Sequence, residues 1–233
     1  NCRARAATLI RQRRSAVAFD GVTTLTAERW FGMLDALLPR QDVPPLDAWP
    51  VPPRVHPLLF AHRIDGIPPG LYLLARSVGA LVELRQALHG EWAWSRVEQA
   101  PEHLPLYKLT VGDARGAARV ISCHQDIAAD SCFALGFLTA FAGPLQDAPW
   151  VYRELFWETG LLGQILYLEA EAVGLRATGI GCFFDDALHR LLGLDGLAWQ
   201  SLYHFTVGGP IEDPRVQTLP PYAHLRRDPT DRT

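Results

Sequence analysis

The sequence predicts an α+β fold, and three observations lead to this class. Segments with helical spacing of apolar residues occur together with segments typical of strands, without the strict alternation of a parallel βαβ sheet. Residues 151–173 are apolar around most of a helical circumference, which predicts a central helix about 35 Å long. Hydrophobic residues make up 48% and charged residues 20% of the chain, as in ordinary globular proteins. We therefore expect one domain over residues 1–233.

The first half of the chain is expected to alternate helices, an irregular connection and a hairpin. Thr26 is suited to cap the second helix, and six prolines between Pro39 and Pro53 exclude regular structure there. The expected elements are a helix over 3–14, a helix starting at Thr26, a hairpin of strands over 55–62 and 67–74, a helix over 78–89, and a surface excursion or lid over 90–105.

The second half is expected to contain the long helix and the remaining strands. Gly174 suits the position just after that helix, and Asp185 and Asp186 suit the first turn of a short helix, as cap and dipole partners. A loop with the sequence Gly179-Ile180-Gly181 joins the two helices. The expected elements are a strand over 106–110, a helix over 113–129, strands over 132–141 and 202–207, and an irregular tail over 216–233.

Charge and composition exclude several classes of partner and site. The net charge of −3 gives no support to a nucleic-acid partner. No apolar run approaches the roughly 20 residues of a membrane span, and the polar, arginine-rich start has no signal-peptide core. The histidines show no metal-binding spacing, so we expect no metal site. Cys2, Cys123, Cys132 and Cys182 form no CxxC pair, which is typical of reduced thiols in a cytoplasmic protein.

Three short motifs can carry binding chemistry. In Arg13-Arg14-Ser15, guanidinium groups and a hydroxyl suit a phosphate, although arginines at a helix end also complement its dipole. The glycines of Gly179-Ile180-Gly181 let a backbone approach a flat ring closely, or form a tight turn. Arg215 follows a strand-ending glycine pair and can close over a phosphate, or remain solvated.

These motifs, in this order, resemble the nitroreductase superfamily of FMN flavoproteins. The segment IRQRRSAVAFDG is similar to its opening motif, and residues 152–194 together with LYHFTVGGPIEDPR resemble its SagB-type dehydrogenase branch. The resemblance implies a mostly antiparallel sheet flanked by helices, with one long buried central helix. It also implies dimerisation, with FMN between the subunits. Longer tandem proteins of this branch contain a similar second half, so the chain is expected to form a homodimer or to pair with a second nitroreductase-like half.

The resemblance also assigns roles to the motifs. Arg13, Arg14 and Ser15 would contact the phosphate, ribityl chain or ring edge of FMN, and Arg215 would reach the phosphate. Gly179, Ile180 and Gly181 would face the ring, with a backbone N–H directed at its N5 edge. The flavin itself would carry the chemistry, so no catalytic side chain is expected.

Two positions depart from the family pattern and leave two functions open. Val17 stands where the family has Arg or Lys near the flavin edge that becomes anionic on reduction, and residues 49–60 lack the family's serine-containing loop. The first hypothesis is an FMN-dependent oxidoreductase that uses NAD(P)H or its substrate as hydride donor, acting on a small molecule or a peptide. The second is a degenerate, non-catalytic module that serves as dimerisation half or flavin-binding scaffold.

Overall fold

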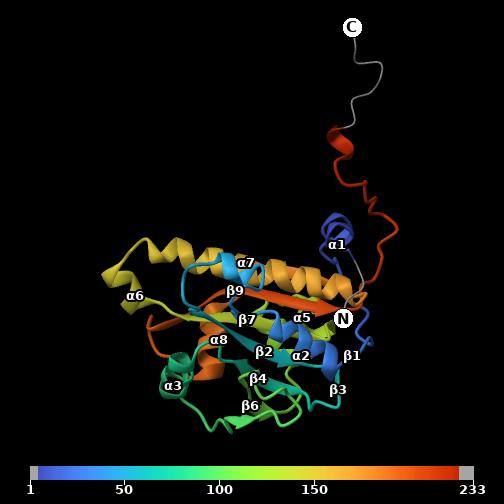
Figure 1. The fold of residues 1–233 in the computed structure, drawn as a ribbon. Coiled ribbons are helices and arrows are strands. Elements are labelled where there is room, and N and C mark those ends of the chain that lie inside the picture. The colour runs from blue at the N-terminus through green and yellow to red at the C-terminus, as the bar shows by residue number, and fades with distance from the viewer. Residues whose placement is uncertain (1–4, 226–233) are drawn as a thin grey trace.

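A computed structural model describes residues 5–225, which form a mixed α+β fold (Figure 1). Its centre is a seven-stranded sheet in the order β5-β6-β4-β2-β7-β9-β8, in which neighbouring strands are antiparallel. A short parallel pair, β1–β3, lies apart. The expected α+β class with an antiparallel sheet is confirmed. The strands are β1 Leu25–Thr26, β2 Val55–Ala61, β3 Ile64–Asp65, β4 Gly70–Leu74, β5 Ser95–Arg96, β6 Leu106–Val111, β7 Phe133–Ala140, β8 Arg176–Ile180 and β9 Trp199–Gly208.

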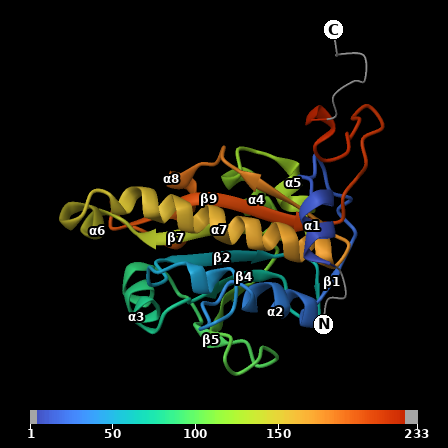
Figure 2. The same cartoon turned by 45° about the horizontal axis from the view of Figure 1, so that its top comes forward.

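Helices cover both faces of this sheet (Figure 2). Because side chains alternate along a strand, Leu59 of β2 packs into the core with α2 and α7, whereas Leu58 and Phe60 pack with α3, α4 and α8. The helices are α1 Ala6–Gln12, α2 Ala27–Asp35, α3 Val78–Ala87, α4 Arg115–Ile121, α5 Asp126–Asp130, α6 Ala142–Asp147, α7 Val151–Ala172 and α8 Asp185–Leu192, with short 3-10 turns at Leu46–Ala48 and Ala223–Leu225.

The long helix α7 lies along the sheet, as the sequence predicts (Figure 2). Its side chains Leu162 and Leu166 are fully buried in the core, whereas Trp157 near its start is exposed. Gly174 follows the helix with φ +81°, a left-handed conformation that glycine adopts at little cost. The predicted cap is also confirmed at α2, where Thr26 Oγ1 accepts a hydrogen bond from the Arg29 N–H.

Two local predictions are wrong. The helix expected over 113–129 is divided into α4 and α5, because Cys123 and His124 have φ values of 55° and 58°, which a right-handed helix excludes. The Gly179-Ile180-Gly181 motif is not a loop, since Gly179 and Ile180 are the last residues of β8 and Gly181 follows the strand.

The expectation of reduced thiols is wrong for one pair of cysteines. Cys123 and Cys182 form a disulfide with their Cα atoms 5.9 Å apart, and a separation of 59 residues gives no sequence signal for such a pair. Cys132 is a buried free thiol, and burial raises its pKa to about 12. Cys2 and Arg3 lie outside the described residues.

The segment over 90–105 is attached to the edge of the sheet. Its strand β5 pairs with β6, and Val97 and Leu104 are buried in the core. A role as a lid stays a prediction, as does the extent of the domain. None of the helices within residues 5–225 has the length and apolarity needed to cross a membrane, and the expected cytoplasmic location stays a prediction.

Candidate cofactor site

The basic triplet predicted from the N-terminal segment lies beside the outer edge of β8. After α1, Ser15 forms a parallel bridge with Ala177, and the Ala16 N–H donates to the Ala177 carbonyl at 3.1 Å. The Thr178 hydroxyl donates to the Ala16 carbonyl at 2.7 Å. Arg13–Ser15 and the glycine motif, which are far apart in the sequence, are thus brought to one strand.

Tyr167 of α7, which no sequence motif indicates, connects these two segments. Its hydroxyl lies 2.8 Å from Ser15 Oγ and accepts a hydrogen bond from the Gly179 N–H at 2.9 Å. The Arg13 guanidinium lies over the Tyr167 ring, 4.8 Å from its centre, and the ring meets Phe205 edge to face. Tyr167 therefore holds the basic triplet in register with β8.

The two glycines of the motif have different surroundings. A Cβ on Gly179 would lie 1.6 Å from the Tyr203 hydroxyl oxygen, so the absence of a side chain there makes room for Tyr203. A Cβ on Gly181 would meet no atom within 4 Å, and Gly181 is exposed. Of the two backbones, that of Gly181 is the one open to a ligand.

A small cavity lies at the phosphate-binding end that the sequence predicts. Its volume is about 60 Å³, and its lining includes Arg14, Ser15, Val17 and Arg176. Pockets that enclose a small-molecule ligand typically measure roughly 300–1,000 Å³, so this cavity does not by itself enclose FMN. The donor set of guanidinium groups, hydroxyl and open backbone fits a phosphorylated, planar group, provided that a second surface completes the site.

The remaining predicted arginines already have protein partners. Arg14 donates to the carbonyls of Arg11, Arg13 and, at 3.1 Å, Leu219 of the C-terminal tail. This tail leaves the body beside α1 (Figure 1). Arg215 forms an ion pair with Asp213 at 2.8 Å, and its guanidinium holds the pKa of that carboxyl below its usual range. Arg215 is not among the residues that line the cavity.

A larger cleft lies away from all seven predicted residues. Its volume is about 940 Å³, and it runs between α2, the C-terminal end of α7 and residues 99–103. His103 there lies 2.9 Å from Asp35, and burial raises the pKa of Glu169. The 90–105 segment thus contributes to this cleft rather than to the surroundings of Gly181.

Tyr167→Phe should lower the free energy of unfolding by about 1–2 kcal/mol, because the Gly179 N–H loses its hydrogen-bond acceptor. Urea denaturation measures this change. The exposed Tyr152 offers a matched control, and Tyr152→Phe should change the free energy by less than about 0.5 kcal/mol. Equal effects of the two substitutions would contradict the connecting role of Tyr167.

Several solved structures have the same fold. A putative nitroreductase from Anabaena variabilis superposes with a TM-score of 0.61 at 21% identity, over 86% of this chain and 37% of that chain. The chain thus spans less than half the length of that protein. The Escherichia coli microcin synthetase McbBCD complex with truncated pro-MccB17 bound gives 0.60 at 17% identity, over 87% and 71%. The NADPH:FMN oxidoreductase from Vibrio harveyi complexed with NAD⁺ gives 0.52 at 16%, over 94% and 74%.

A search of curated proteins gives no match. The sequence pattern of the nitroreductase family, in contrast, matches residues 83–209, which is more than half of the chain and runs from within α3 to just past the end of β9. The chain belongs to the nitroreductase family.

Proposed function

We propose that this domain is part of an FMN-dependent oxidoreductase of the SagB-type branch, with the flavin between it and a second nitroreductase-like domain. The observation that carries the proposal is the arrangement along β8. The basic triplet lies beside Ala177, and the open Gly181 follows four residues later, about 13 Å away at the rise of an extended strand. In this proposal, β8 and the residue that follows it offer an anion-binding end and a backbone that a planar ring can approach.

Each residue has a defined task in this proposal. Arg13, Arg14 and Ser15 bind the phosphate or the ring edge through charge-assisted hydrogen bonds, and Arg215 adds a cation once it leaves Asp213. Gly181 admits the ring because it has no side chain, whereas the side chain of Ile180 beside it is buried in the core and does not face the ring. Bound FMN supplies the hydride chemistry. Gly179 helps to hold β8 in place, because its N–H binds the Tyr167 hydroxyl and its lack of a side chain makes room for Tyr203.

Structures with the same fold support three parts of the proposal: the electron donor, the pairing with a second domain and the substrate class. The Vibrio harveyi protein is an NADPH:FMN oxidoreductase complexed with NAD⁺, which favours NAD(P)H as electron donor. This chain covers only 37% of the Anabaena variabilis protein, which favours a tandem arrangement in which a second nitroreductase-like half completes the small cavity. The McbBCD complex has truncated pro-MccB17 bound, and we retain both a peptide and a small molecule as substrate classes.

The visible spectrum of the purified protein tests this function. We expect a flavin spectrum, either as isolated or after addition of FMN. Arg14→Met should weaken FMN binding at least roughly tenfold, since a hydrogen-bonded charge contributes about 1.5–3 kcal/mol. The exposed Arg5 at the start of α1 is the control, and Arg5→Met should leave FMN affinity unchanged. A colourless protein that gains no flavin spectrum with FMN would overturn the proposal.

Val17 favours a second candidate, a degenerate module that binds flavin without turnover or acts as a dimerisation half. Val17 is 68% exposed and lines the small cavity beside Arg14, so the chain offers an apolar side chain at the position where the resemblance implies a cation for the reduced flavin. Anaerobic titration with NADPH separates the two candidates. Bleaching of the bound flavin supports the oxidoreductase, and a flavin that stays oxidised supports the module.

A further inference from the structure

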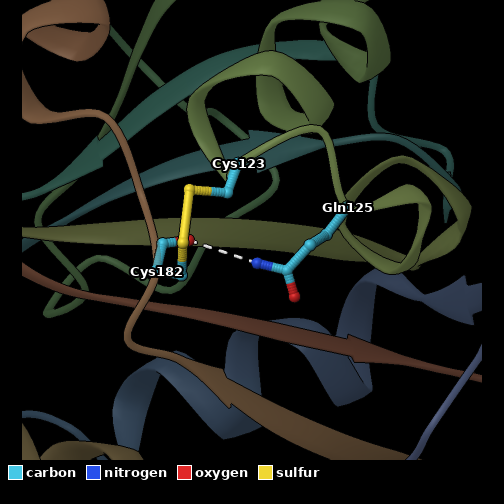
Figure 3. The surroundings of a disulfide bond; sticks show 3 residues. All are labelled: Cys123, Gln125 and Cys182. Carbon is cyan, nitrogen blue, oxygen red and sulfur yellow. Dashed lines mark hydrogen bonds between the residues drawn. A yellow bond between two sulfur atoms is a disulfide. The ribbon is translucent and has the colours of Figure 1, made fainter.

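The Cys123–Cys182 disulfide joins two segments that are far apart in the sequence (Figure 3). Cys123 lies between α4 and α5, and Cys182 is the second residue after β8. Their Cα atoms are 5.9 Å apart, within the usual range for a disulfide. The cross-link is therefore one residue away from the backbone that the proposed function places at the flavin.

The two cysteine residues of the disulfide differ in exposure. Cys182 is exposed and Cys123 is partly buried, whereas Cys132 is fully buried. Exposed disulfides are typically the labile ones, and thiol exchange proceeds by attack on an accessible sulfur. We therefore expect a thiol in solution to attack the disulfide at Cys182.

Other contacts hold the two segments together independently of the sulfur–sulfur bond. The Phe184 N–H donates to the Ile121 carbonyl at 2.7 Å, and Gln125 Nε2 donates to the Cys182 carbonyl at 3.2 Å (Figure 3). The rings of His124 and Phe184 also meet edge to face. With these contacts in place, two reduced thiols stay within reach of each other, so the bond can reform without refolding of the domain.

The turn that carries Cys123 is in a costly conformation. Cys123 and His124 are consecutive non-glycine residues in the left-handed region, where side chains are strained unless their surroundings hold them. The disulfide is one of the constraints that hold this turn against the Gly181 segment. Breaking it therefore loosens both segments.

We propose that Cys123–Cys182 is a redox-active disulfide that exchanges with small thiols at Cys182 and whose state controls the Gly181–Phe184 segment. In the reductive direction a thiolate attacks Cys182 Sγ, the sulfur–sulfur bond breaks, and Cys123 leaves as a thiolate and takes up a proton. A second thiolate attacks the reagent sulfur of the mixed disulfide and releases Cys182. Two thiols are oxidised to one disulfide, and the protein gains two electrons and two protons.

Counting accessible thiols with a maleimide reagent tests the exchange, in a full-length Cys2→Ser background so that Cys2 does not contribute. The oxidised native protein should bind no reagent, and after dithiothreitol it should bind two, with an unchanged circular dichroism spectrum. Glutathione disulfide should return the count to zero. Two reactive thiols before reduction, or thiols that appear only with loss of the folded spectrum, would overturn the proposal. Cys132→Ser should behave as its parent in every step.

Amide hydrogen exchange at Phe184 tests control of the segment. Its rate should rise at least roughly threefold on reduction, as local opening becomes easier, and Cys123→Ala/Cys182→Ala should show the reduced rate without any reductant. Phe205 in β9 should not change. Equal rates at Phe184 in both states would refute the control. Any effect of the disulfide on flavin chemistry rests on the proposed function. The thiol count and the exchange rate are measured without flavin, so a failure to bind FMN would not change what they show about the disulfide.

Discussion

Arg76→Met should lower the free energy of unfolding by about 3–5 kcal/mol, because it leaves the buried charge of Glu158 without its partner. Both side chains are 1% exposed and form an ion pair. Arg76 also donates to the carbonyls of Leu37 and Val55 at 2.7 and 2.9 Å. Glu158 accepts the Arg54 N–H at 3.1 Å. This network fastens α7 to the start of β2, so its loss affects the helix that carries Tyr167.

Two further variants show whether burial of the charge causes the loss. Arg76→Met/Glu158→Leu should recover much of the stability, since replacing a buried ion pair by apolar residues is often neutral. Arg54→Met breaks the pair with Glu154, which lies at 3.0 Å and is partly exposed, and should cost less than about 1 kcal/mol. Urea denaturation monitored by tryptophan fluorescence measures all three. Similar losses for Arg54→Met and Arg76→Met would contradict the explanation.

The parts of the fold that the sequence predicts are those set by local patterns. The apolar spacing within residues 151–173 predicts α7 almost to its last residue, and Gly174 predicts where it ends. The division between α4 and α5 has no such pattern. It depends on Cys123 and His124, whose left-handed conformations are held by contacts with a segment 59 residues away.

The candidate site was predictable to a similar extent. The charge pattern of Arg13-Arg14-Ser15 indicates an anion-binding segment, and the structure brings it to β8. Tyr167 gave no signal, because a tyrosine within an apolar helix is typical of a core position. Its hydroxyl acquires a role when β8 forms an outer edge whose Gly179 N–H needs an acceptor. That need is a property of the sheet, which the local sequence does not reveal.

Gly179→Ala should lower the free energy of unfolding by about 2–3 kcal/mol, since overpacking displaces the neighbouring side chain. The added Cβ would lie 1.6 Å from the Tyr203 hydroxyl oxygen and 2.6 Å from its ring carbon Cζ, so the ring must move. Gly179→Ala/Tyr203→Leu removes both of these atoms and should recover most of the loss. If the single variant is as stable as its parent, Tyr203 does not fill the space beside Gly179.

Gly181→Ala is the matched change on the other glycine of the motif, and its expected result is the opposite. With no atom within 4 Å of the new Cβ, the free energy of unfolding should change by less than about 0.5 kcal/mol. FMN affinity should nevertheless fall roughly tenfold, or about 1.4 kcal/mol, because the methyl group would stand where the ring approaches the backbone. FMN titration followed by fluorescence quenching measures this loss. An unchanged affinity would mean that Gly181 does not face the flavin, while a loss in both stability and affinity would mean that the segment is packed more tightly than its surroundings indicate.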